Sequence, residues 1–216
     1  MLVSWNTILG AFLETVQMVS ISFIFSIILG LPLGILLYVT RPGQILENKA
    51  VFTVLNAVIN VFRSLPFIIL LVAIIPVTKF IVGTSIGTEA AIVPMVFFAG
   101  PYISRLVESS LLEVDEGVLE AADAMGATPM QTIIKFVLPE ALGSLIVNFT
   151  ISIIGLVGAS AMAGTVGGGG IGDLAITYGY QRFDTITMLI TVVILIIMVQ
   201  GLQSAGNKLA RVVRRR

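Results

Sequence analysis

Long runs without a charged residue constrain the fold of this chain more than any other feature. Three of them lie between Glu14 and Arg41, between Glu140 and Asp173, and between Asp184 and Lys208. Each run is long enough for a helix that crosses the ~30 Å of bilayer hydrocarbon, which takes roughly 20 apolar residues. Because the backbone polar groups of a span must be satisfied inside the membrane, we expect an all-α integral membrane protein.

We expect five transmembrane helices in one transmembrane domain that occupies the whole chain, 1–216. The expected spans cover approximately 15–39, 54–78, 87–104, 142–164 and 185–207, with a loop over about 105–140. The second and third spans are shorter than the others and carry Pro66, Pro94 and Pro101, so they could merge or break.

The basic residues choose the orientation of such a chain, because cytoplasmic loops carry an excess of Lys and Arg. With the C-terminus inside, nine basic residues lie on the cytoplasmic side: Arg41, Lys49, Arg105, Lys135, Lys208, Arg211, Arg214, Arg215 and Arg216. Only Lys79 and Arg182 lie outside. This bias predicts an external N-terminus, a cytoplasmic C-terminus and a cytoplasmic 105–140 loop.

Composition excludes several kinds of chemistry. The chain has no Cys and no His, which removes disulfides, thiol chemistry, the usual zinc sites and imidazole catalysis. No nucleophile–base pair or metal cluster is apparent, so a membrane enzyme is the least favoured class. Glu14 and Glu89 lie only at the ends of expected spans, so no span has an internal carboxylate of the kind that proton-coupled transporters use. The energy for any transport is therefore expected to come from a partner.

The segment Glu120-Ala121-Ala122-Asp123-Ala124-Met125-Gly126-Ala127-Thr128-Pro129 has the pattern of a helix, a sharp stop and a new helix. Gly126 suits a C′ position, where the backbone turns left-handed. Thr128 and Gln131 match a Thr-x-x-Gln capping box, and Pro129 fits the first helical position. We therefore expect a short helix on the loop between the third and fourth spans.

This short helix has one apolar face. Met130, Ile133, Ile134 and Val137 follow the i, i+3, i+4, i+7 spacing, and we expect Pro139 to end the helix. An apolar face on a loop needs something to cover it. The spacing does not decide between a soluble partner and the inner spans of the chain itself.

Two similarities to nucleotide or nucleic-acid sites fail on context. From Arg105 to Glu140 there are two basic and seven acidic residues, a net charge of −5, and DNA-binding helix-turn-helix motifs need Lys and Arg at phosphates. Gly167, Gly169 and Gly172 fit G-x-G-x-x-G, but they follow a membrane helix rather than a strand. We expect no nucleic-acid partner, and a flexible turn on the outer side at the glycines.

Some residues inside the expected spans have two interpretations. Arg63 is either an anchor that reaches the membrane interface or a substrate or inter-subunit contact. Gly30 and Gly34, like Gly155 and Gly158, mark either tight helix packing or a helix that needs room to move. Ser160 and Met162 are placed toward a transport pathway, although a methionine there fits a core equally well.

The loop resembles that of a known family. Glu120-Ala121-Ala122, then Gly126, then Leu138-Pro139 resembles the EAA loop of permease subunits in binding-protein-dependent ABC importers, E-A-A-x3-G-x9-I-x-L-P, with Phe136 where Ile is usual. Phe62-Arg63-Ser64-Leu65-Pro66 is similar to a segment of amino-acid uptake permeases. Three further segments are similar to methionine importer permeases: Leu37 to Gln44, Val82 to Gly87 and Met125 to Met130.

The resemblance implies a type I ABC importer permease fold and a bacterial inner-membrane location in contact with lipid. It implies a homodimer around a central pathway, two ABC ATPase subunits that bind ATP and Mg, and a periplasmic substrate-binding lipoprotein. The chain itself would then be non-catalytic and hold no cofactor or metal. The implied cargo is methionine, L- and D-; another amino acid, or a stand-alone secondary transporter, are the alternatives.

The resemblance also implies roles within the loop. A coupling helix over about 128–136 would rest in a groove of the ATPase, with Gly126 setting the bend and Glu120 anchoring the loop through a hydrogen bond. The implied coupling set is Glu120, Ala121, Ala122, Gly126, Ala127, Thr128, Pro129, Met130, Ile133 and Pro139. Ser160, Met162 and Arg63 are the candidate pathway residues.

Overall fold

The computed structural model describes residues 2–214, which form helices and no strand. Arg215 and Arg216, which the orientation argument used, lie outside the described residues. Four long helices dominate: α1 (Trp5–Thr40), α5 (Thr88–Leu112), α8 (Leu138–Gly164) and α10 (Thr185–Arg214). Shorter elements connect them: α2 (Lys49–Ser64), α3 (Phe67–Ala73), α4 (Ile75–Val82), α6 (Glu116–Ala124), α7 (Pro129–Thr132), η1 (Ile133–Val137), α9 (Gly170–Leu174) and η2 (Ala175–Gln181).

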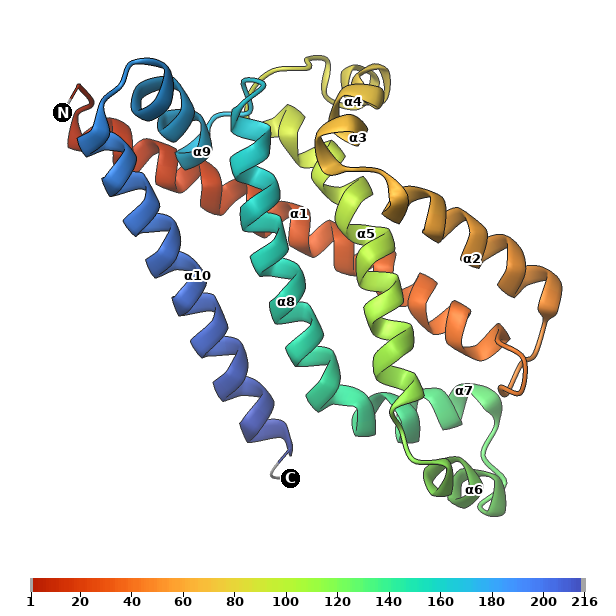
Figure 1. The fold of residues 1–216 in the computed structure, drawn as a ribbon. Helices are drawn as coiled ribbons and strands as arrows, with labels where there is room; N and C mark the ends of the chain where they lie inside the picture. Colours follow the sequence, from red (N-terminus) through yellow and green to blue (C-terminus); the bar gives the residue numbers. More distant parts are fainter. Residues whose placement is uncertain (1, 215–216) are drawn as a thin grey trace.

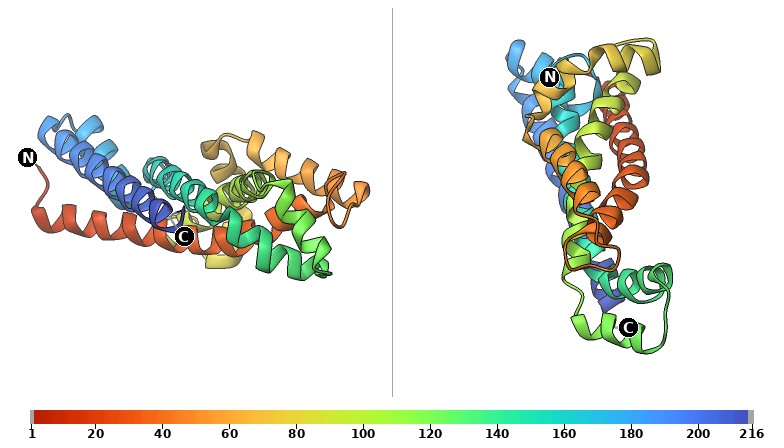
Figure 2. Two further views of the ribbon diagram at one scale, coloured as in Figure 1. Left: turned by 90° about the horizontal axis from the view of Figure 1, so that it is seen from below. Right: turned by 90° about the vertical axis from the view of Figure 1, so that its right-hand side faces the viewer.

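The molecule is elongated along its long helices (Figure 1). The N-terminal end of α1 lies with α3, α4 and α9 at one end, and α6, α7 and the end of α10 lie at the other (Figures 1 and 2). We call the first the α9 end and the second the α6 end. Helices α5 and α8 pack against α1, and α10 packs on α8.

The expected all-α membrane fold is confirmed. Among residues 2–214, four helices are long and apolar enough to cross a membrane, or five if α2 and α3 form one broken span. The break between α2 and α3 is a bend of 102°. It falls at Pro66, which lacks a backbone N–H and disfavours the helical conformation of the residue before it. Pro94 and Pro101, in contrast, lie inside the continuous α5. The limits of the bilayer along these helices stay a prediction.

Glycines bring α1 into direct contact with α5. A Cβ at Gly30 would lie 2.7 Å from the carbonyl oxygen of Gly100, and one at Gly34 would lie 2.5 Å from that of Ser104. No real Cβ tolerates such distances, so tight packing is the correct interpretation of this pair. Gly155 and Gly158 on α8 have open space around them. We call the contact at Gly30 and Gly34 the α1–α5 seam.

The glycine run between α8 and α9 forms the expected turn, whose flexibility stays a prediction. Gly167, Gly169 and Gly170 have φ between +76° and +85°, which explains the residue type. The N–H of Gly170 donates to the Glu14 carboxylate at 2.8 Å, and the N–H of Ile171 donates to the Thr15 hydroxyl at 2.9 Å. These bonds fasten the turn to α1, because two neighbouring polar side chains of α1 accept from backbone N–H groups of the turn.

The start of the chain is fastened at the same end of the molecule. Asp184, just before α10, accepts hydrogen bonds from the N–H of Leu2 and from the hydroxyl of Thr187, the latter at 2.7 Å. The Leu2 N–H, followed by the Thr187 hydroxyl, lowers the pKa of Asp184 from 3.8 to about 2. The α9 end is therefore held together by polar contacts between the first residues of the chain and segments more than 150 residues later.

Candidate functional site

The loop between α5 and α8 contains the predicted helix, stop and second helix. α6 begins at an Asp115 cap, whose carboxylate accepts from the N–H of Gly117 at 2.8 Å. It ends in a Schellman motif: the N–H of Gly126 donates to the carbonyl of Asp123 at 2.8 Å, and that of Ala127 to Ala122 at 3.0 Å. Gly126 has φ +70°, and a Cβ there would meet nothing within 4 Å. Backbone conformation alone therefore demands this glycine.

The predicted capping box starts α7. The N–H of Gln131 donates to the Thr128 hydroxyl at 3.4 Å, and the N–H of Thr128 donates to the Gln131 side-chain oxygen at 2.9 Å. Pro129 occupies the first helical turn, where its missing N–H costs nothing. The two motifs together fix the angle between α6 and α7.

Pro139 does not end the helix, so this expectation was wrong. The chain continues from α7 through the π-helical turn η1 directly into α8, with Pro139 in the first turn of α8. In η1 the N–H of Leu138 donates to the carbonyl of Ile133, five residues back. This wider turn changes the hydrogen-bond register just before the proline and lets the helix proceed past it. The loop helix is thus joined directly to a long helix of the membrane domain.

The structure divides the apolar face of this helix between two environments. Ile133 is 6% exposed and Val137 is fully buried, in a cluster with Val107 and Leu111 of α5. Met130 is 65% exposed and Ile134 is 55% exposed. One half of the face therefore anchors the loop to the chain's own core, and the other half is open. Met125, beside the bend, is exposed as well.

The remaining predicted loop residues have different environments. Ala122 is fully buried, Ala127 is half-buried, and Ala121, Pro129 and Pro139 are exposed. The Glu120 side chain is exposed and makes no hydrogen bond or ion pair with residues 2–214, so the expected anchor within the chain is not present. Its carboxylate is free to meet another molecule.

A groove of about 450 Å³ lies beside α7. Its walls come from the loop after α1 and from both helices of the α6–α7 loop: Gly43, Gln44, Ile45, Leu119, Asp123, Ala127, Pro129 and Thr132. The α1–α2 connection therefore lies next to the predicted coupling segment, which the sequence pattern did not indicate.

The three candidate pathway residues do not share one environment. Ser160 is 1% exposed, and its hydroxyl donates to the carbonyl of Val157 at 2.8 Å within α8. Met162, two residues on, is 52% exposed. Arg63 is exposed in the last turn of α2. Of the three, Met162 and Arg63 offer accessible side chains, and their roles stay predictions.

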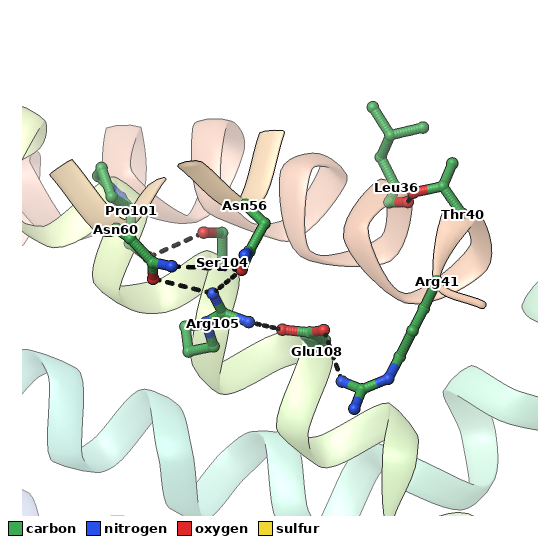
Figure 3. A network of polar contacts seen from close by, with 9 residues as sticks. All are labelled: Leu36, Thr40, Arg41, Asn56, Asn60, Pro101, Ser104, Arg105 and Glu108. Atoms are coloured by element: carbon green, nitrogen blue, oxygen red, sulfur yellow. Dashed lines mark hydrogen bonds and ion pairs between the residues drawn. The ribbon is translucent and has the colours of Figure 1, made fainter. Parts of the chain in front are cut away.

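Sequence reasoning missed a polar network around the buried Glu108 at the α6 end of the long helices (Figure 3). Glu108 of α5 is 1% exposed and forms ion pairs with Arg105 at 2.5 Å and Arg41 at 3.2 Å. Arg105 also donates to Asn56 and, at 3.0 Å, to Asn60, both on α2. The network joins α1, α2 and α5. The i, i+3 spacing of Arg105 and Glu108 was the available signal, but their partners come from distant parts of the sequence.

Comparison with known proteins gives the family. Residues 30–212 match the model of the "Binding-protein-dependent transport system inner membrane component". The chain belongs to this family. The seam, the loop and the network are therefore features of a multi-pass membrane protein of a transport system.

Individual relatives are more specific. The chain is 53% identical to a probable D-methionine transport system permease protein, MetI, of Vibrio cholerae, over 95% of this chain and 92% of the relative. It is 54% identical to the D-methionine transport system permease protein MetI of Escherichia coli, over 74% and 73%.

Solved structures give the same relationship. A structure of the MetNI methionine ABC transporter in an inward-facing conformation is similar with a TM-score of 0.95 and 48% identity, over 98% of this chain and 99% of that one. An amino acid ABC transporter with histidines shares the fold, with a TM-score of 0.79 and 17% identity.

Proposed function

We propose that this chain is the membrane-spanning permease subunit of an ATP-driven methionine importer. The observation that carries the proposal is the similarity to the inward-facing methionine transporter over 98% of the chain at a TM-score of 0.95. Both the sequence and the arrangement of helices are retained, which is more than a shared fold. In such an importer this chain provides the path across the membrane and an ATPase subunit provides the energy.

The exposed half of the α7 face is the proposed contact with that ATPase. Met130, Ile134 and Met125 offer an apolar surface of flexible side chains, which suits a groove on a partner protein. The buried half, Ile133 and Val137, holds α7 to α5. A push on the exposed half would therefore be passed to the core, and Glu120 would bond to the partner rather than to its own loop.

The remaining parts of the assembly follow from the same proposal. Two copies of the chain would enclose the pathway, two ATPases would bind ATP and Mg at the α6 end, and a substrate-binding lipoprotein would deliver methionine at the α9 end. The excess of basic residues near the α6 end supports a cytoplasmic position for that end, with the N-terminus outside. Met162 and Arg63 are the proposed pathway side chains.

Reconstitution tests the proposal. The chain is placed in lipid vesicles with its ATPase and binding protein, and uptake of L- and D-methionine is measured with ATP and with a non-hydrolysable analogue. We expect uptake only with hydrolysable ATP. Uptake without the ATPase would identify a secondary transporter. If another amino acid inhibits the uptake more strongly than unlabelled methionine does, the cargo is different.

A further inference from the structure

Helix α2 is held to the rest of the molecule by unusually little apolar packing. Of its 16 residues only Ile59 is buried. An apolar cavity of about 180 Å³ lies between α2, α1 and α5, although the rings of Phe62 and Phe97 still meet with centroids 6.2 Å apart. It is lined by Leu29, Leu33, Leu55, Val58, Ile59, Phe62, Val96, Phe97 and Pro101. Helix interfaces that fix a geometry are normally filled to the density of a crystal. The packing therefore leaves α2 room to shift.

Hydrogen bonds between α5 and α2 add to this limited apolar packing. Asn56 and Asn60 are one helical turn apart on α2, and both side-chain oxygens accept from the same nitrogen, Nη2, of Arg105 (Figure 3). One guanidinium on α5 therefore holds two successive turns of α2. We call these three residues the α2 latch.

The latch is easier to break on the α2 side than on the α5 side. Arg105 donates through Nη1 to Glu108, whose other oxygen accepts from Arg41. If α2 moved away, Arg105 would lose hydrogen bonds to neutral amides and keep its ion pair. The buried Glu108 would never be left unpaired, which is the costly event in such networks. The network thus lets α2 separate from α5 without breaking the contact between α5 and Arg41.

The position of Arg105 connects the latch to the loop. α5 ends at Leu112, and α6 starts at Glu116, so a displacement of the loop reaches Arg105 along two turns of helix. From this geometry we infer that Arg105 is a positioning residue for transport: it holds α2 against α5 in the state described here and releases it when the loop moves. This inference rests on the proposed function, because it needs a transport cycle.

The test uses the reconstituted complex and two α2 variants, one that weakens the latch and one that strengthens it. Asn56→Ala with Asn60→Ala removes both acceptors, and we expect substrate moved per ATP to fall about tenfold, as for the loss of one or two ordinary hydrogen bonds. Asn60→Asp replaces a neutral acceptor with a charged one. We expect it to slow uptake and hydrolysis together, with substrate per ATP unchanged. The exposed Thr53 on the same helix supplies the control, Thr53→Ala.

The inference is overturned if the double variant keeps the control's ratio of substrate to ATP at equal abundance in the membrane. It is also overturned if Asn60→Asp lowers that ratio as the double variant does. If the two asparagines only stabilised the fold, both variants would be expected to lower the ratio in the same way. A different result would show that the proposed function itself is wrong. In that case the unmodified complex would show no ATP-driven methionine uptake at all.

Discussion

The two contacts that α5 makes with its neighbours are opposites. Toward α1 it meets Gly30 and Gly34, where backbone lies against backbone with no room for a methyl group. Toward α2 it meets a cavity of about 180 Å³ and two asparagines. One surface is defined by shape and the other by a few hydrogen bonds.

This difference indicates which parts move together. A close-packed seam has few alternative arrangements, because any shift creates clashes or voids. A cavity with a polar contact at its edge can exist in two arrangements that differ by little more than those bonds. We therefore treat α1 and α5 as one rigid unit and α2 as the element that changes place.

The seam is the contact whose disruption should have the largest effect. Gly34→Leu places a side chain where a Cβ alone would lie 2.5 Å from the Ser104 carbonyl, and we expect a loss of more than about 3 kcal/mol in the free energy of unfolding. Gly155→Ala is the matched control, because that glycine has open space and Ala gains up to about 1 kcal/mol in a helix. Denaturation in detergent measures both. Equal stability of the two variants would mean that α1 and α5 are not rigidly joined.

The bend at Gly126 should show a smaller effect on stability and a clear one on coupling. Gly126→Val forces a β-branched residue to φ +70°, at a cost of about 1–2 kcal/mol. Because nothing lies near its Cβ, the membrane helices should remain intact. We expect normal membrane insertion, continued ATP hydrolysis and reduced uptake. Gly126→Asn, which tolerates this conformation better, should retain more uptake; equal uptake by all three proteins would contradict the role of the bend.

The cavity provides the opposite kind of change. Val96→Ile adds one methylene to a wall of the space between α5 and α2, and we expect a gain of about 0.8 kcal/mol in stability. We also expect slower uptake, because α2 then has less room. Val157→Ile is the control, since Val157 is 3% exposed in a filled core and should lose stability instead. Stabilisation with unchanged uptake would show that α2 does not use this space.

The smallest effect is expected at the α9 end, outside both contacts. The folded-state pKa of Asp184 is about 2, below its ordinary 3.8, so its contribution to stability is complete above about pH 4 and is lost as the pH falls toward 2. Asp184→Asn should lower the thermal midpoint at pH 7 by a few degrees, and the difference from the unmodified chain should shrink below pH 4. Glu116→Gln at the α6 end is the comparison. A pH-independent difference would mean that the carboxylate charge is not what fastens Leu2.

Local signals predicted local structure well. The capping box at Thr128 and the left-handed Gly126 depend on residues within a few positions of each other, and the structure has both. The charge-free runs predicted the helical membrane fold, because each run is one continuous segment and corresponds to one long helix. The expected end at Pro139 was wrong because a π turn, in which Ile133 and Val137 are both buried, changes the hydrogen-bond register before it.

Features that depend on distant residues were out of reach. Arg41, Asn56 and Glu108 lie far apart in the sequence, and no spacing rule brings them together. The division of the α7 face into a buried and an exposed half likewise required knowledge of where α5 runs. For the candidate site, the sequence therefore predicted the loop and its turns but not its connection to the helices above it.

The length of α1 has a consequence for the surrounding lipid. Its 36 residues extend over ~54 Å, whereas even a span tilted by about 40° needs only ~39 Å to cross the hydrocarbon. About ten residues of α1 must then extend beyond the hydrocarbon core of the bilayer. Because the seam ties α1 to α5, a thinner or thicker bilayer that changes the inclination of α1 would also tilt the helix that leads into the loop. The thickness of the bilayer is therefore expected to influence the orientation of α5 and of the loop that follows it.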